Sequence, residues 1–313
     1  MKIAEFTALL DRAYRRHHVI GDERFGVVAG LDLEGRLFTV LDGEVVSRVN
    51  AEAIMAVSTR HKYQNPGGDV LWPAPEGTMF GYEYTAGTWR VPPEITGARY
   101  VVVQSAQSSA VIEAEIDLVN NKGIGIPCLF TRDIHLDAGG NARVMHVKES
   151  ITYLGTRTLQ RGEFLIAPWS LSQFDSGPGA EVVFPHAAGS VRDLYDASDS
   201  QRSVRDGLCH TKTDTSQRYQ IAISAAVDHI EYHNPEKKLT VRRTAEKIRS
   251  GRYIDIADAP PDTIPSDIGV RFSVYSDKSG FMEIEAAGGC IDELKNGDTL
   301  RLRVSTAFST GDM

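Results

Sequence analysis

The chain has 313 residues, of which 42% are hydrophobic and 24% charged, and its formal net charge is −8. This composition is that of a globular protein with a sizeable core, and it excludes a disordered chain. The acidic balance, without an evident basic patch, argues against a nucleic-acid partner, because binding to phosphates requires clustered positive charge.

Motifs for common cofactors and metals are missing from the sequence. It contains no P-loop, no G-x-G-x-x-G and no H-E-x-x-H, and its three cysteines show neither the spacing of a zinc site nor that of a disulfide framework. We therefore expect no cofactor and no metal centre. Three isolated cysteines suit a reducing compartment, so the expected location is the cytoplasm.

The first 20 residues are predicted to form an amphipathic helix at the edge of the fold, with its helical turns over residues 3–16. Apolar residues recur there at helical spacing, at Ile3, Phe6, Leu9, Leu10, Ala13 and Tyr14. The run is too interrupted by charge for a signal peptide. No stretch of the chain is long enough in apolar residues to span a membrane, so no membrane partner is expected.

From residue 21 to the end, the apolar period changes from that of a helix to that of β-strands. The segment 24–49 contains two hairpin signals, "DLEGR" and "LDGE", and similar short β-rich runs continue as far as residue 308. Almost no strand–helix–strand alternation is visible. We therefore predict an all-β protein with large antiparallel sheets stacked in two layers, in a single domain of residues 21–313.

The segment 67–77, "GGDVLWPAPEG", is too rich in glycine and proline for a helix or a central strand. It places Trp72 and Glu76 on a rigid turn. Similar motifs follow in order, including "WRVPPEI" at 89–95, "IAPW" at 166–169 and "FMEIEAAGGCIDELKNGD" at 281–298. In this order they resemble the bacterial relatives of galactose mutarotase, in the aldose 1-epimerase-like β-supersandwich superfamily. The resemblance implies that fold over roughly residues 20–308.

The resemblance also implies acid–base chemistry on a sugar, with a glutamate on a late strand as the base and a histidine as the acid. In an extended strand, Glu283 and Glu285 lie on one face about 7 Å apart, and we favour Glu285 as the base. If the preceding strand pairs with this one, Arg271 and Tyr275 line the same surface and can contact the substrate.

The family's histidine is missing from its usual position, where this chain reads Ala167-Pro168-Trp169. His135, His146, His186 and His210 are the replacements that we consider, and we favour His210 because charged residues surround it in the sequence.

Sugar sites combine an aromatic ring with charged groups that bind hydroxyls. Trp72, Trp169, Glu76 and Arg90 fit that description and are expected to bind substrate. Two functions remain open. One is a carbohydrate-binding, mutarotase-like protein with epimerase-like activity, and the other is a non-catalytic sugar-binding or sensing protein that has lost the acid histidine. In both, the partner is a small-molecule carbohydrate.

Overall fold

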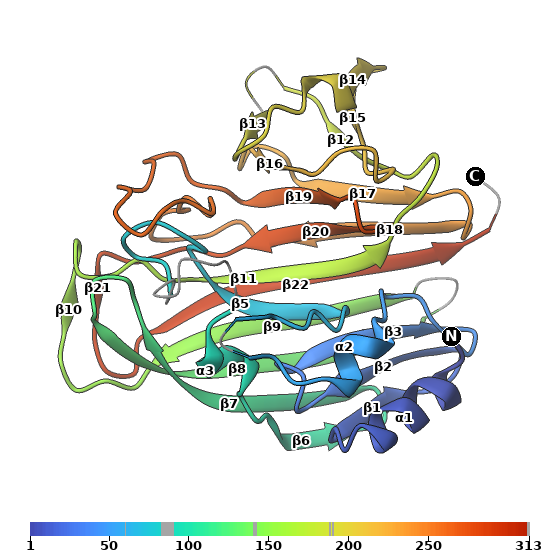
Figure 1. Cartoon of the computed structure of the whole chain (residues 1–313), viewed down its shortest axis with the longest axis horizontal. Helices are drawn as coiled ribbons and strands as arrows, with labels where there is room; N and C mark the ends of the chain where they lie inside the picture. The colour runs from blue at the N-terminus through green and yellow to red at the C-terminus, as the bar shows by residue number, and fades with distance from the viewer. Residues whose placement is uncertain (60, 83–90, 140–142, 188, 190, 312–313) are drawn as a thin grey trace.

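The computed structural model describes residues 1–59, 61–82, 91–139, 143–187, 189 and 191–311 (Figure 1). Within these ranges it contains 22 strands and three short α-helices, α1 (Ile3–Arg12), α2 (Ala51–Met55) and α3 (Pro93–Thr96), together with the 3-10 turn η1 (Asp199–Gln201). The predicted all-β class with large antiparallel sheets is confirmed.

Most strands belong to two ten-stranded sheets. The first sheet runs in the order β1 (His17–Gly21), β2 (Phe25–Gly30), β3 (Arg36–Leu41), β5 (Asp69–Ala74), β11 (Ala167–Asp175), β20 (Phe281–Ala287), β19 (Phe272–Asp277), β16 (Tyr219–Ile223) and β13 (Val191–Asp193), with β4 (Glu44–Val45) paired to β3. The second runs in the order β14 (Arg202–Arg205), β15 (Leu208–Lys212), β12 (Glu181–Pro185), β17 (His229–Asn234), β18 (Leu239–Ala245), β22 (Thr299–Thr310), β9 (Val144–Tyr153), β8 (Gly125–Asp137), β7 (Ser109–Val119) and β6 (Val101–Ala106). A small third sheet pairs β10 (Leu159–Gln160) with β21 (Glu293–Leu294).

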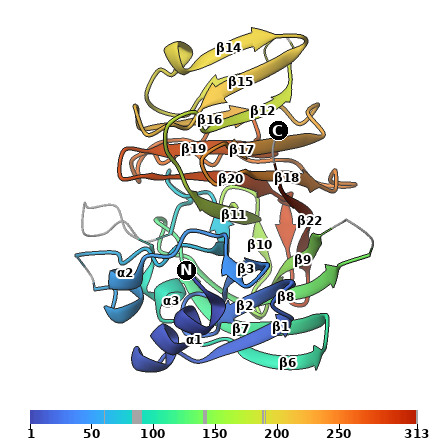
Figure 2. The same ribbon diagram turned by 90° about the vertical axis from the view of Figure 1, so that its right-hand side faces the viewer.

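The two large sheets stack face to face and share one hydrophobic core (Figure 2). Strands of the second sheet, such as β7 and β22, bury alternate residues. This is the pattern of a sheet with one face against the core and one face exposed to solvent. In the first sheet β20 is buried at all seven positions. The outer face of the first sheet is therefore also covered at β20, and polar side chains on that face must find hydrogen-bond partners inside the protein.

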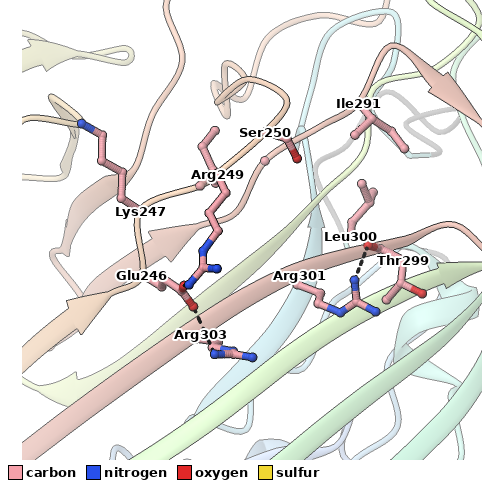
Figure 3. Close-up of a pocket in the computed structure, with 11 residues that line it drawn as sticks. Glu246, Lys247, Arg249, Ser250, Ile291, Thr299, Leu300, Arg301 and Arg303 are labelled. Atoms are coloured by element: carbon pink, nitrogen blue, oxygen red, sulfur yellow. Dashed lines mark hydrogen bonds and ion pairs between the residues drawn. The ribbon is translucent and has the colours of Figure 1, made fainter.

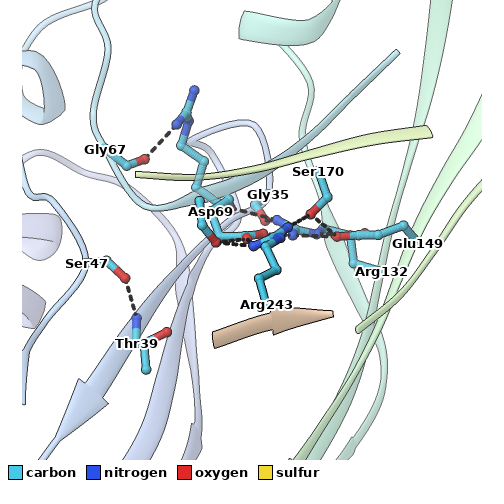
Figure 4. Close-up of polar contacts among 11 residues, drawn as sticks. Gly35, Thr39, Ser47, Gly67, Asp69, Arg132, Glu149, Ser170 and Arg243 are labelled. Atoms are coloured by element: carbon cyan, nitrogen blue, oxygen red, sulfur yellow. Dashed lines mark hydrogen bonds and ion pairs between the residues drawn. The ribbon is translucent and has the colours of Figure 1, made fainter. Parts of the chain in front are cut away.

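A buried ionic cluster joins the two sheets (Figure 4). Arg132 on β8 donates to Glu149 on β9 at 2.7 and 3.0 Å and also forms an ion pair with Asp69 on β5. Arg243 on β18 donates to the Asp69 carboxylate at 2.9 Å. Burial alone would raise the pKa of Asp69, but Arg243 and Arg132 outweigh it and hold that pKa below its ordinary value. The cluster therefore fixes β5 against the second sheet with an ionised carboxylate.

The N-terminal helix is shorter than predicted. It ends at Arg12, because Tyr14 adopts a positive φ of 53° and the Arg15 N–H donates to the Leu10 carbonyl at 2.9 Å. Residues 17–21 then form β1, which pairs with β2. The prediction that the helical segment extends to residue 20 is therefore wrong, because residues 17–21 form an edge strand of the first sheet.

The helix itself covers the outer face of this sheet. Phe6, Leu9 and Leu10 pack on Val28 and Phe38 in a small core separate from the one between the sheets. Among the described residues, no helix has the length and apolar character required to cross a membrane.

Candidate functional site

A pocket of about 380 Å³ opens on the outer face of the first sheet. On β11, Ser170 and Ser172 point toward Arg243 of the second sheet. Trp169 and Leu171 alternate with them and therefore point the opposite way, into the pocket. The described residues that line it are Tyr63, Asn65, Trp72, Glu76, Trp169, Leu171, Tyr195, Arg218, Gln220, Asp258, Tyr275, Asp277, Phe281 and Glu283. They come from five neighbouring strands and from the loops between them.

Strand β20 places two carboxyl groups at the base of this pocket. Glu283 lines the pocket and accepts a hydrogen bond from the Gln173 amide at 2.6 Å. Glu285 is fully buried behind it, where it accepts hydrogen bonds from Trp169 Nε1 at 3.0 Å and from Gln220 Nε2 at 3.0 and 3.1 Å. Of these two carboxyl groups, Glu283 is therefore the one within direct reach of a molecule in the pocket.

Both carboxyls hold their protons more tightly than an ordinary glutamate does. Burial raises the pKa of Glu283 to about 7, although Arg36 and the hydrogen bond from Gln173 act in the opposite direction. Burial and the neighbouring charge of Glu283 raise the pKa of Glu285 well above its usual range. Near neutral pH Glu285 is therefore protonated, whereas Glu283 is close to its titration midpoint and can either give or take a proton.

Tyr275 is the cross-strand neighbour of Glu283 in the β19–β20 pair. Its hydroxyl donates to the Asp277 carboxylate and accepts a hydrogen bond from Arg218 Nε at 3.2 Å. The guanidinium of Arg218 also stacks 4.5 Å from the centre of the Tyr195 ring. Burial is the largest cause of a raised pKa for Tyr275, and the hydrogen bond to Asp277 and the charge of its carboxylate raise that pKa further. Its phenol therefore stays neutral at physiological pH.

Trp72 forms part of the pocket wall and is 7% exposed. Its indole Nε1 donates to Glu34 Oε2 at 3.0 Å, and the same oxygen accepts from Arg36 Nη2 at 3.0 Å and from the Tyr63 hydroxyl at 3.3 Å. The ring meets Trp169 edge-on, with 6.2 Å between the ring centres. The prediction of a turn here is wrong for residues 69–74, which form β5, a central strand between β3 and β11. Pairing of β5 with β11 places Trp72 opposite Trp169, and this pairing and the hydrogen bond to Glu34 fix its orientation at the pocket.

The other residues singled out from the sequence occupy different places. Glu76 lines the pocket with Trp72, and Arg90 lies outside the described residues. Arg271 turns away from the pocket, where its guanidinium donates to the carbonyls of Val227 at 2.8 Å and Ala225 at 3.1 Å. His210 lies on β15 in the second sheet, where it contacts Glu181 at 3.2 Å. The structure therefore does not bring Arg271 or His210 to the carboxyl pair.

Several residues that line the pocket, or that support its wall as Glu34 supports Trp72, were missed from the sequence. Glu34 lies in the "DLEGR" turn, which gave only a hairpin signal, and Gln220 and Tyr195 reach the pocket through pairing between distant strands. Asp277 could have been found, because it follows Tyr275 by two residues on the same strand face. Within the described part of the chain, no three His, Cys, Asp or Glu side chains are grouped so that they could hold a metal ion.

The fold is galactose mutarotase-like. The structure matches a galactose mutarotase-like protein from Lactobacillus casei with a TM-score of 0.60 and 11% identity, over 94% of this chain and 100% of that chain. It also matches a galactose mutarotase related enzyme from Lactobacillus acidophilus with a TM-score of 0.57 and 14% identity, over 95% and 98% of the two chains.

At these identities the likeness shows the fold alone. By sequence, the chain belongs to DUF6786, a family of unknown function whose model matches residues 22–257. No curated protein matches it in sequence.

Proposed function

We propose that the pocket binds a small carbohydrate and performs acid–base chemistry on it, with Glu283 exchanging a proton with a sugar hydroxyl. The observation that carries this proposal is the buried carboxyl pair at the base of an aromatic pocket. A carboxyl with a pKa of about 7 suits proton transfer near neutral pH, since both of its protonation states are populated there.

The remaining pocket residues support a sugar as the ligand. Trp72, Tyr63 and Phe281 supply aromatic surface for the C–H face of a sugar ring, and Asn65 and Arg218 supply polar groups for hydroxyls. The galactose mutarotase-like fold adds support by analogy, because relatives with this fold are named for sugar chemistry.

Each carboxyl then has its own role. We assign the base to Glu283 in place of Glu285, because Glu283 lines the pocket and Glu285 lies behind it. Glu285 keeps its proton and, through Trp169 and Gln220, holds the floor of the pocket in shape. Tyr275 has a raised pKa that makes it a weak proton donor, so its assigned role is a hydrogen bond to a sugar oxygen.

The second candidate is a non-catalytic sugar-binding or sensing protein. One observation favours it: none of the described residues that line the pocket is a histidine, the residue expected as the acid.

A thermal-shift screen against neutral mono- and disaccharides tests sugar binding in either case. A ligand at 100 times its Kd stabilises the folded state by about 2.7 kcal/mol. Replacing the pocket arginine, Arg218→Gln, should weaken binding of any sugar found by about 1–3 kcal/mol. The matched surface variant Arg205→Gln, on β14, should bind like the wild type. If no sugar shifts the melting temperature, or if the two variants behave alike, the pocket is not a sugar site.

A further inference from the structure

A second pocket, of about 370 Å³, lies on the outer face of the second sheet (Figure 3). Its floor is the exposed side of β22, and its walls are the loop after β18 and the segment after β20. The lining residues are Glu246, Lys247, Ile248, Arg249, Ser250, Gly289, Ile291, Thr299, Leu300, Arg301 and Arg303. We call this pocket the arginine cleft.

Three arginines and one carboxylate line the arginine cleft. Arg249 and Arg303 both approach Glu246, at 3.1 and 3.5 Å. Arg301 has only a 3.4 Å contact with the Thr299 carbonyl and no acidic partner among the described residues. In Figure 3 the ammonium group of Lys247 points away from these three. The cleft therefore carries a local charge of about +2 even without Lys247, on a chain whose net charge is −8.

This concentration of positive charge is unfavourable for the empty protein. Arg301 and Arg303 are two residues apart on one strand face, which places their Cβ atoms about 7 Å apart, and like charges at such spacing repel. Lys148 on β9 is the cross-strand neighbour of Arg303, but it pairs with Asp133 at 2.8 Å and so does not compensate the arginines. One carboxylate cannot neutralise the cluster, whereas a bound anion would.

We infer that the arginine cleft binds a small phosphate ester. Guanidinium groups match the geometry of phosphate oxygens with paired hydrogen bonds. Here Arg249 and Arg303, from distant parts of the sequence, meet at Glu246, and Arg301 lies beside them on β22. Ile248 and Ile291 give the wall an apolar part that a non-phosphate group can contact. This site goes beyond the proposed function, since it lies on the second sheet and the sugar pocket lies on the opposite, outer face of the first.

Isothermal titration calorimetry with pyrophosphate at constant ionic strength tests this inference. The wild type should bind, and the double variant Arg301→Gln/Arg303→Gln should bind about 10- to 100-fold more weakly, because it loses charge-assisted hydrogen bonds. The matched control Arg24→Gln removes an exposed arginine outside the cleft and should bind like the wild type. Both cleft residues are exposed, so the variants should fold, and circular dichroism checks that they do. If the double variant misfolds, Arg249→Gln, which alters a side chain that is 87% exposed, replaces it.

Two further measurements locate the anion and identify its source. Arg218→Gln should leave pyrophosphate binding unchanged, and loss of binding in that variant would place the anion in the sugar pocket and overturn the inference. Binding to vesicles that contain phosphatidic acid, without binding to pyrophosphate, would make the cleft a lipid contact and also overturn it. The inference would also be overturned if the double variant and the Arg24→Gln control bound pyrophosphate with equal affinity, or if the wild type did not bind it.

Discussion

Glu283 and Glu285 are two residues apart on β20, yet their surroundings give them different chemistry. Glu283 is 8% exposed, lines the pocket and has a pKa of about 7. Glu285 is fully enclosed by Trp169, Gln220 and Glu283. The difference arises because a carboxyl loses hydration as it is buried, and a second carboxyl nearby disfavours its charge further.

The raised pKa of Glu283 predicts how stability depends on pH. The folded state holds the proton more tightly than the unfolded state, in which a glutamate titrates near 4.5, so this group contributes stability at low pH. The contribution is lost as the pH rises from about 4.5 to about 7, and it should amount to on the order of 3 kcal/mol. Urea unfolding at pH 5 and pH 8 measures it.

The variant Glu283→Gln is the control for that measurement, because its amide does not titrate. Its free energy of unfolding should fall less than that of the wild type between the two pH values. Equal losses in the two proteins would mean that Glu283 has an ordinary pKa in the folded state.

The sequence predicts part of this site and misses the rest for a physical reason. The period of two residues along a strand places Glu283, Glu285 and Tyr275 on one face, and the β19–β20 register agrees with that placement. Strand periodicity carries no information about which distant strands become neighbours. Glu34 and Gln220 could therefore not be connected to Trp72 and Glu285 before the sheet order was known.

At the scale of elements, the ionic cluster between the sheets is expected to be structural. Arg243→Met removes one partner of Asp69 and leaves a buried carboxylate with too little compensating charge. The loss should be about 3–5 kcal/mol in the free energy of unfolding. Chemical denaturation monitored by circular dichroism measures this loss.

The matched control is Arg143→Met, which breaks an exposed ion pair with Asp42. Surface pairs contribute about 0–1 kcal/mol, so this variant should remain close to the wild type. Similar losses of unfolding free energy in both variants would show that the buried cluster stabilises the fold no more than a surface ion pair does.

Helix α1 illustrates why the ends of elements are harder to predict than their presence. Ala13 and Tyr14 continue the helical spacing of apolar residues, so the periodicity does not mark the end of the helix. The helix ends where Tyr14 adopts a positive φ. Glycine usually occupies such a position, so a tyrosine there gives no sequence signal for the end of the helix. The amphipathic face itself was predictable, since Phe6, Leu9 and Leu10 are all buried.

At the scale of the whole molecule, the two large sheets should unfold together. Their inner faces contribute to one continuous core, from Val27 and Leu71 in the first sheet to Ile134 and Val304 in the second. In the variant Trp89→Phe, tryptophan fluorescence reports on Trp72 and Trp169 in the first sheet, and far-ultraviolet circular dichroism reports on both sheets. Coincident transitions are expected. Two separated transitions would show that the sheets form independent units, against the single domain proposed for residues 21–313.

Exchange of a sugar between its two anomers, followed by NMR at saturating concentration of a sugar that binds, tests the catalytic proposal most directly. The wild type should accelerate the exchange above the rate in buffer. Glu283→Gln should lower the catalysed rate by about 10²–10⁴-fold with little change in Kd, because it removes the proton acceptor and keeps the shape of the pocket. Glu285→Gln, behind the pocket wall, should retain most of the rate. A wild type that binds the sugar without accelerating exchange, or a Glu283→Gln variant as fast as the wild type, would contradict the assignment of Glu283 as the base.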